Sequence, residues 1–161
     1  MNDLPRIGLG IDVHRLEPGR PCMLAGIAIE SPVGPVGHSD GDAVLHALCD
    51  AVLGACGLDD LGTLFSDRDA ENKDRASADF CAETMRQLRQ RRLCVWSLDV
   101  VIETETPRLA PHRPAMRTRI GELFAVPEDR VNLKGKTGEK VGPIGRGEAI
   151  RATAIALIGP A

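Results

Sequence analysis

The sequence predicts a single α+β domain in which helices cover one face of one β-sheet. Two observations lead to this prediction. Segments with strand-like alternation occur near both ends of the chain and in its middle, and segments with helical apolar spacing lie between them. The predicted order is strands, helix, helix, strand, helix, strand and strand, for which one sheet with helices on one side is the economical solution. With 161 residues, we expect one domain over 1–161 with a substantial core.

The first predicted strand covers residues 7–14, and its two faces differ. Apolar side chains on one face alternate with two glycines and then with Asp12 and His14 on the other. Residues two apart on a strand share a face, so Asp12 and His14 can reach one ion. The glycines leave space for a ligand or another backbone. A dinucleotide-binding fingerprint is disfavoured, because Val13 replaces the third glycine and an amphipathic helix does not follow.

Turn residues divide the next segment, and a helix follows it. Pro18 and Gly19 predict a turn, residues 22–29 two short strands, and residues 31–37 a loop. The helix runs from about residue 43 to Gly54 or Gly57. Its apolar residues form a stripe that should face a core: Val44, Ala47, Leu48, Ala51, Val52 and Ala55.

The start of this helix carries a candidate metal ligand. Asp40 or Asp42 can cap it, because a short carboxylate accepts the unpaired N–H groups there. Asp42, His46 and Asp50 lie four residues apart and form a second stripe. His46 suits either a metal ligand with carboxylate support or a hydrogen-bonded histidine near the core. With Asp12 and His14 it would give three ligands and an open fourth position, as in a catalytic zinc site, and the same donors permit manganese or cobalt.

The second half of the chain supplies the remaining elements. The acidic segment 59–69 is interpreted as a solvated loop with one short helical turn. Ser77 can cap a second helix that runs to about Arg91, with a solvated basic face. A loop with three prolines over 104–114, a third helix, a short strand over 131–134 and a final strand over 150–158 complete the order. The expected inward residues are Phe80, Cys81, Met85 and Leu88 in the second helix, Trp96, Leu98, Val100 and Ile102 in the middle strand, and Met116, Ile120, Leu123 and Phe124 in the third helix.

A glycine-rich basic loop over 135–147 is a candidate phosphate site. Its glycines expose backbone N–H groups, Thr137 offers a hydroxyl, and Lys134, Lys136, Lys140 and Arg146 match phosphate charge. It is not a Walker loop, because the upstream glycine spacing and a following helix are lacking. A flexible surface loop is the alternative. Glu139 among these cations suits a magnesium ion shared with phosphates.

Composition narrows the classes of function. A net charge of −3 gives no general electrostatic case for nucleic acid or anionic membranes, and three Phe, one Trp and no Tyr disfavour base-stacking platforms. The five cysteines form no CxxC pair and are interpreted as reduced, partly buried thiols. Residues 1–6 lack a signal-peptide pattern and no apolar run reaches spanning length, so we expect a cytoplasmic protein.

Taken together, the motifs resemble those of the 2-C-methyl-D-erythritol 2,4-cyclodiphosphate synthase family. The resemblance covers about residues 6–158, the expected core of the domain. It rests on Asp12-Val13-His14, on His38-Ser39-Asp40-Gly41-Asp42 with His46, on Asp60-Leu61-Gly62, on Phe65-Ser66-Asp67-Arg68-Asp69, on Pro107-Arg108-Leu109, and on Thr137-Gly138-Glu139-Lys140 with Gly145-Arg146-Gly147-Glu148.

This resemblance implies a cyclising phosphorus–oxygen lyase of the non-mevalonate isoprenoid pathway. The 2-phosphate of 4-diphosphocytidyl-2-C-methyl-D-erythritol 2-phosphate would attack the β-phosphorus and release CMP. The resemblance further implies a homotrimer with active sites between subunits, zinc at Asp12, His14 and His46, and magnesium or manganese at Glu139 with the substrate diphosphate. His38 and Thr137 would stabilise the transition state.

The resemblance also implies which residues contact the substrate. Those at the metal and methylerythritol end would be Asp12, Val13, His14, His38, Ser39, Asp60, Leu61, Gly62, Phe65, Ser66, Asp67, Arg68 and Asp69. Those at the cytidine diphosphate end would be Thr104, Glu105, Thr106, Pro107, Arg108, Leu109, Ala110, Lys136, Thr137, Gly138, Glu139, Pro143 and Arg146.

The chain departs from the family pattern at two positions. Lys136 replaces a threonine found in many relatives, and Pro143 replaces a phenylalanine that often faces a central cavity of the trimer. Two other functions use the same residues. A metal-dependent phosphohydrolase would activate water with the same three ligands and yield linear products, whereas a non-catalytic nucleotide-binding module would turn nothing over.

Overall fold

The protein, a computed structural model described here over residues 4–37, 39–65 and 75–161, is built on one five-stranded sheet. Its strand order is β4-β1-β7-β5-β6, and only β5 and β6 pair in parallel. The strands are β1 (Arg6–Pro18), β4 (Val33–Pro35), β5 (Leu93–Glu103), β6 (Val131–Lys136) and β7 (Ala149–Pro160). A separate hairpin joins β2 (Cys22–Leu24) to β3 (Ile27–Ile29), as the sequence predicted.

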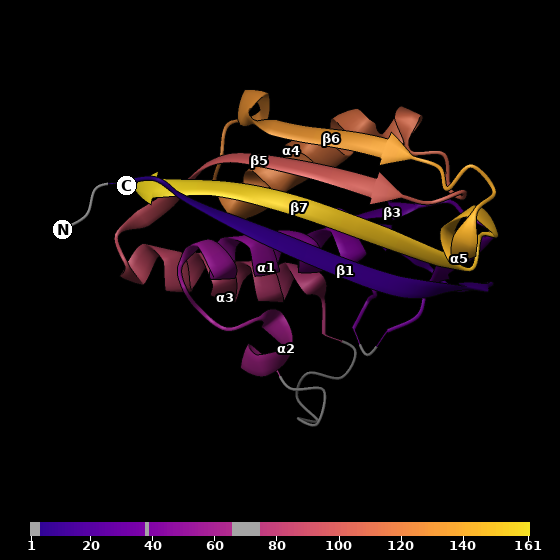
Figure 1. The fold of residues 1–161 in the computed structure, drawn as a ribbon, viewed down its shortest axis with the longest axis horizontal. Helices are drawn as coiled ribbons and strands as arrows, with labels where there is room; N and C mark the ends of the chain where they lie inside the picture. The colour runs from indigo at the N-terminus through magenta and orange to yellow at the C-terminus, as the bar shows by residue number, and fades with distance from the viewer. Residues whose placement is uncertain (1–3, 38, 66–74) are drawn as a thin grey trace.

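Helices cover one face of this sheet, which confirms the predicted fold class (Figure 1). The three long ones are α1 (Ala43–Ala55), α3 (Ser77–Gln90) and α4 (Arg113–Phe124). The short helices α2 (Leu61–Leu64) and α5 (Gly142–Gly145) and the 3-10 turns Ala110–His112 and Glu128–Arg130 lie in the connections. Within the described ranges, no helix combines the length and apolarity that a membrane crossing requires.

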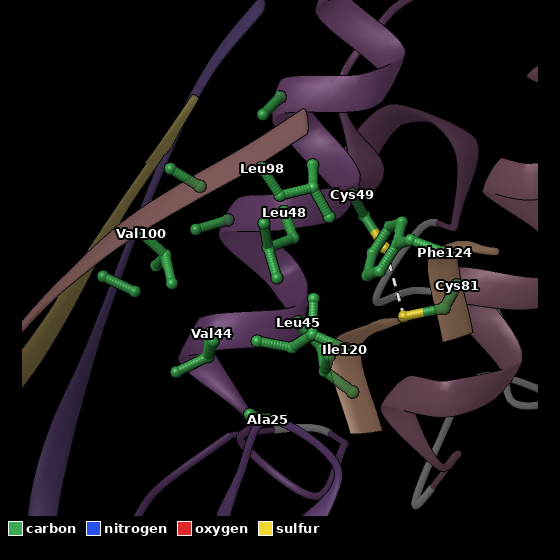
Figure 2. Packing of buried hydrophobic residues seen from close by; sticks show 14 of the residues in the cluster. Ala25, Val44, Leu45, Leu48, Cys49, Cys81, Leu98, Val100, Ile120 and Phe124 are labelled. Carbon is green, nitrogen blue, oxygen red and sulfur yellow. Dashed lines mark hydrogen bonds between the residues drawn. The ribbon is translucent and has the colours of Figure 1, made fainter. Parts of the chain in front are cut away.

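Helix α1 is the centre of the core. It packs on β1 and β7 on one side and on α3 on the other, so it is buried nearly all round rather than along one stripe. Figure 2 shows Leu45 and Leu48 among side chains from β5, α3 and α4. Only the line of His46, Asp50 and Gly54 is not fully buried along the helix.

The glycines of β1 let α1 come close to the sheet. A Cβ on Gly8 would lie 1.8 Å from the Ala51 carbonyl oxygen, and one on Gly10 would lie 2.0 Å from that of Ala47. No side chain larger than hydrogen fits at these positions. The empty face predicted from the sequence is therefore filled by the backbone of α1, which brings His46 over Asp12 and His14.

The opposite face of β1 is apolar and exposed. Its four side chains are between 51% and 72% accessible, and Ile155 of the neighbouring strand β7 is 47% accessible. In order along β1 they are Ile7, Leu9, Ile11 and Val13. A sheet face of this composition is unusual on a lone chain, and large exposed apolar patches commonly mark interfaces.

Several sequence expectations need correction. The segment 31–37, predicted as a loop, contains β4, which pairs with the end of β1. Ala76, not Ser77, occupies the N-cap position of α3. A bulge between Val95 and Ser97 turns Val95 into the core and leaves Trp96 half-buried, because one extra residue reverses the alternation. The short strand continues to Lys136. The glycine-rich loop contains α5, because the left-handed backbone at Gly142 allows a tight turn there.

Candidate metal centre and two clefts

Three side chains from β1 and α1 converge on one point. Asp12 and His14 share the helix-facing side of β1, and His46 projects from the line of α1 that is not fully buried. The Asp12 Oδ2 atom lies 2.8 Å from His14 Nε2 and 3.2 Å from His46 Nδ1, and the two nitrogens are 3.4 Å apart. The structure thus brings together the three ligands that the sequence nominated.

The spacing of these atoms fits a tetrahedral metal ion. Ligand atoms about 2.0–2.2 Å from one such ion lie roughly 3.3 Å from each other. The three measured separations, 2.8, 3.2 and 3.4 Å, bracket that value. Two imidazoles and one carboxylate are donors that zinc, manganese and cobalt accept. Among the described residues, Asp12, His14 and His46 form the one group of three or more candidate ligands that lie close enough together to share an ion.

The outer nitrogen of each histidine is also occupied. His14 Nδ1 lies 2.8 Å from the Val36 carbonyl oxygen, to which it can only donate. His46 Nε2 lies 3.2 Å from the Ser39 hydroxyl and 3.0 Å from the Ser77 hydroxyl. Outer hydrogen bonds of this kind fix the ring orientation of metal-binding histidines. They leave His14 Nε2 and His46 Nδ1 turned toward Asp12.

Charge couples the three ligands before any ion binds. Burial raises the pKa of the Asp12 carboxyl, but hydrogen bonds from His14 and His46 outweigh this and hold it well below its usual range. Burial lowers the pKa of His14. The hydrogen bond to Asp12 and the negative charge of Asp12 raise it by more, so the pKa of His14 lies above its ordinary value. A positive charge is therefore favoured at the centre of the cluster, as a metal-binding site requires.

The two other carboxylates of α1 have structural partners. Asp42 is fully buried and caps α1 by accepting the N–H groups of Val44 and Leu45, both at 3.1 Å. The same carboxylate accepts the N–H groups of Ala25 at 2.9 Å and Gly26 at 2.6 Å, which ties the β2–β3 turn to the helix. Burial raises the pKa of Asp42 to about 6, against the opposing effect of these N–H donors. Asp50 accepts the Leu61 N–H at 2.7 Å and so joins α2 to α1.

The cluster of Asp12, His14 and His46, called the metal cluster below, lies in a cleft of about 360 Å³. Besides the three ligands, the cleft is lined by Val36, Gly37, Ser39, Asp50, Leu61, Gly62, Phe65 and Phe80. The Phe65 and Phe80 rings are tilted against each other, with centroids 4.8 Å apart and planes at 51°, and Arg75 lies over both at 5.4 and 5.7 Å. Asp60 caps α2 at the rim through the Thr63 N–H at 2.8 Å. Hydrogen bonding by the Thr63 side chain, and then by this N–H, lowers the pKa of Asp60. The cleft therefore combines an apolar wall with a polar floor that could hold a metal ion.

A second cleft of about 330 Å³ lies where the parallel strands β5 and β6 end. Two connections are tied together there: the Thr104 N–H donates to the Lys136 carbonyl at 2.9 Å, and the Gly138 N–H donates to Glu105 at 2.8 Å. The lining residues are Thr104, Glu105, Pro107, Arg108, Leu109, Ala110, Arg113, Gly135, Lys136 and Thr137. Arg108, Arg113 and Lys136 make this cleft cationic, as the binding of a diphosphate would require.

The remaining nominated residues lie in different places. Thr137 donates its hydroxyl to Glu139 at 3.1 Å, so the proposed catalytic threonine and second metal ligand are adjacent. The Val13 side chain projects from the outer face of β1, away from the metal cluster. Pro143 is exposed on α5, and Arg146 forms a two-bond pair with Glu148. Lys134 pairs with Asp99 at 2.6 Å. His38 and the segment Ser66, Asp67, Arg68 and Asp69 lie outside the described residues.

Sequence reasoning missed several residues of both clefts. Phe80 was assigned only to the core, yet its ring lies 5.8 Å from that of His46. Ser77 was interpreted as a cap, and Arg113 was not nominated for any site. Phe80 sits three positions after Ser77, so both lie on the side of α3 that faces α1. The sequence shows that Ser77 and Phe80 share one side of this helix, but it does not show which helix that side packs against.

Known proteins resemble the whole chain. A model of the YgbB family matches residues 5–159. The 2-C-methyl-D-erythritol 2,4-cyclodiphosphate synthases of Burkholderia thailandensis and Burkholderia mallei are both 45% identical over 153 residues, 95% of this chain and 94% of theirs. A solved 2C-methyl-D-erythritol-2,4-cyclodiphosphate synthase in a CDP-bound form is 42% identical with a TM-score of 0.89, over 95% of this chain and 99% of that one. IspF of Plasmodium falciparum, solved as a CDP complex, is 29% identical with a TM-score of 0.87 over 99% of both chains.

Proposed function

The chain belongs to the YgbB family, and we propose that it is a cyclase that converts 4-diphosphocytidyl-2-C-methyl-D-erythritol 2-phosphate to 2-C-methyl-D-erythritol 2,4-cyclodiphosphate with release of CMP. This makes it an enzyme of the non-mevalonate isoprenoid pathway. The observation that carries the proposal is the Asp12–His14–His46 cluster inside a cleft, in a chain 45% identical to synthases of that name.

The two clefts divide the substrate between them. The metal-binding cleft, with its apolar wall and the rim carboxylate of Asp60, suits a phosphorylated branched polyol. The cationic cleft at Arg108, Arg113 and Lys136 suits a nucleoside diphosphate. Its described lining residues carry no aromatic ring, so the cytosine would be read by backbone groups and small side chains. A relative solved in a CDP-bound form, with a TM-score of 0.89, supports the presence of a site for a nucleoside diphosphate.

The proposed cyclisation requires that the two phosphates be positioned and that the charge developing on them be stabilised. The attacking 2-phosphate is already an anion, so a strong general base is not required. The barrier lies in bringing two phosphates together, and fixed cations and hydrogen-bond donors lower it. We propose that Asp12, His14 and His46 hold zinc and that Glu139 helps to hold a second divalent cation with the diphosphate. When bound, such ions polarise phosphoryl oxygens and neutralise the charge that develops on them. Thr137, with His38, would stabilise the transferring group.

We further propose that the enzyme works as a homotrimer with its sites between chains. Within one chain the clefts share no lining residue. Asp12 pairs with Ala152, Ala152 with Ile102 and Ile102 with Gly135, so the clefts are three strand spacings apart, roughly 14 Å. The exposed apolar face of β1 and β7 lies on the other side of the sheet from the metal-binding cleft and would be covered by neighbouring copies. A heterologous interface that closes into a ring would set the first cleft of one copy against the second cleft of the next.

Product analysis tests the proposed reaction. The protein, loaded with zinc and supplied with magnesium, is incubated with the proposed substrate while CMP release is followed and products are identified by phosphorus NMR. We expect equimolar CMP and the cyclic diphosphate. Linear phosphate products would indicate a phosphohydrolase instead, and absence of CMP would refute the proposal.

A further inference from the structure

A partly buried chain of hydrogen bonds runs from Asp40 through Ser77 to His46. The Ser77 hydroxyl donates to Asp40 Oδ1 and lies 3.0 Å from His46 Nε2. Asp40 Oδ2 also accepts the Ser77 backbone N–H at 3.0 Å, and its Oδ1 accepts the Asp42 N–H at 3.2 Å. Ser77 is fully buried at the first turn of α3, and it is separated from Asp40 by 37 positions in the chain. We infer that Asp40 and Ser77 are positioning residues that hold His46 in the tautomer able to bind a metal.

The direction of the hydrogen bonds carries this inference. The Asp40 carboxylate accepts from three donors, namely the Ser77 hydroxyl, the Ser77 N–H and the Asp42 N–H. A hydroxyl has one proton, and that of Ser77 is committed to Asp40. Toward His46 the Ser77 oxygen can therefore act only as an acceptor. His46 Nε2 must therefore carry a hydrogen. Without an ion Nδ1 can also donate to Asp12 Oδ2 at 3.2 Å, and the lone pair freed when that proton leaves is the one that faces the ion.

Ser39 cannot supply the same selection. Its hydroxyl oxygen lies 3.2 Å from His46 Nε2 and accepts the Gly41 N–H at 3.3 Å, so its own proton is not committed to any of these groups. It can donate to His46 or accept from it, and it tolerates both tautomers. Ser77 differs from Ser39 because the Asp40 carboxylate accepts the Ser77 hydroxyl proton. The same carboxylate satisfies an N–H group at the start of α3, where Ala76 has no side chain able to do so.

The inference rests on the proposed metal centre, and zinc affinity tests it without reference to turnover. Zinc dissociation constants are measured by competition with a chromophoric chelator for the intact protein and for Ser77→Ala, Ser77→Thr, Asp40→Asn and the double variant Asp40→Asn/Ser77→Ala. Asp79→Asn is the matched control, because it removes an exposed carboxylate from the first turn of the same helix without touching His46. Metal-free melting curves establish that each variant is folded at the temperature of the titration.

We expect Ser77→Ala to weaken zinc binding about tenfold, the lower end of the usual effect of removing an outer partner of a metal ligand. Ser77→Thr, which keeps the hydroxyl, should bind zinc as the intact protein does, and so should Asp79→Asn. Asp40 acts through Ser77, so the double variant should lose no more affinity than Ser77→Ala alone. Unchanged affinity in Ser77→Ala, or losses that multiply in the double variant, would overturn the inference.

Nitrogen-15 NMR of the histidine rings gives a second reading that needs no variant. In the zinc-free protein His46 Nε2 should carry a hydrogen, whether or not Nδ1 donates to Asp12. Ser77→Ala should shift the ring toward a mixture of tautomers. A His46 ring with its hydrogen on Nδ1 alone in the intact protein would refute the inference. Failure to bind zinc at all would also overturn it, together with the proposed metal centre, whereas zinc binding without CMP release would leave it standing and refute only the proposed reaction.

Discussion

Replacing Gly10 with alanine tests the close approach of α1 to β1, on which both the core and the metal centre depend. The new Cβ would lie 2.0 Å from the Ala47 carbonyl oxygen, 2.7 Å from the Ala51 nitrogen and 3.0 Å from the Ala47 carbonyl carbon. Backbone atoms cannot rotate away as a side chain can. Reaching even 3.0 Å from the oxygen requires α1 and β1 to separate by about 1 Å.

That separation has two measurable consequences. Forced overpacking by backbone displacement costs about 3 kcal/mol of unfolding free energy, the upper end of the usual range. Because His46 moves with α1 while Asp12 and His14 stay on β1, ligands now 3.2 and 3.4 Å apart would separate. A site that must be held within about 0.5 Å should then bind zinc at least about tenfold more weakly.

Urea unfolding of the metal-free protein and zinc competition measure the two effects. Gly54→Ala is the matched control, because Gly54 lies on α1, the helix that Gly10 approaches. A Cβ at Gly54 would meet nothing closer than the Leu9 carbonyl oxygen at 4.0 Å. Alanine in this helix position should raise the unfolding free energy by about 0.5–1 kcal/mol. A Gly10→Ala protein that is as stable as the control and binds zinc normally would refute the reasoning.

Four further predictions follow from the site and the fold. His46→Ala should lose stoichiometric zinc by elemental analysis while circular dichroism shows the fold intact; zinc retained at one per chain would remove His46 from the ligand set. Asp42→Ala should lower the unfolding free energy by at least about 2 kcal/mol, because it leaves buried N–H groups of Ala25, Gly26, Val44 and Leu45 without their acceptor; a urea midpoint equal to that of the intact protein would contradict this. Zinc affinity should fall about tenfold per pH unit below the pKa of His14, which lies above its ordinary value of 6.5, because the ion must displace that proton; a pH-independent dissociation constant between pH 5 and about 7 would be inconsistent with the cluster. Ile11→Asp should yield folded monomers in light scattering, because it places a charge on the exposed apolar face of β1; an unchanged trimer would exclude that face as the interface.

The metal centre could be predicted because local patterns specify it. Alternation along β1 puts Asp12 and His14 on one face, and helical spacing puts His46 on an accessible line of α1. The two glycines between the apolar residues of β1 indicated space for a ligand or another backbone, and the structure places the backbone of α1 there. Nothing in the alternation, however, shows which face of β1 the helices cover, and the apolar face turned out to be the exposed one.

The parts that sequence reasoning got wrong depend on distant partners or on one inserted residue. Ser77 is a residue type that commonly caps helices, but Asp40, 37 positions earlier, accepts hydrogen bonds from both its N–H and its hydroxyl. The bulge at Trp96 reverses the alternation of β5 without any change in residue type that would announce it. The second cleft exists because β5 and β6 pair in parallel and end together, which brings Glu105 to Gly138.

Subunit complementation tests most directly the central claim that each active site combines the first cleft of one chain with the second cleft of its neighbour. His46→Ala and Thr137→Ala chains are each expected to be inactive in the CMP assay. When the two are mixed, unfolded and reassembled together in equal amounts, about a quarter of the interfaces of a closed ring would pair an intact first cleft with an intact second cleft. Recovery of about a quarter of the intact activity is the predicted result. Mixed trimers without activity would contradict the claim and place each site within a single chain.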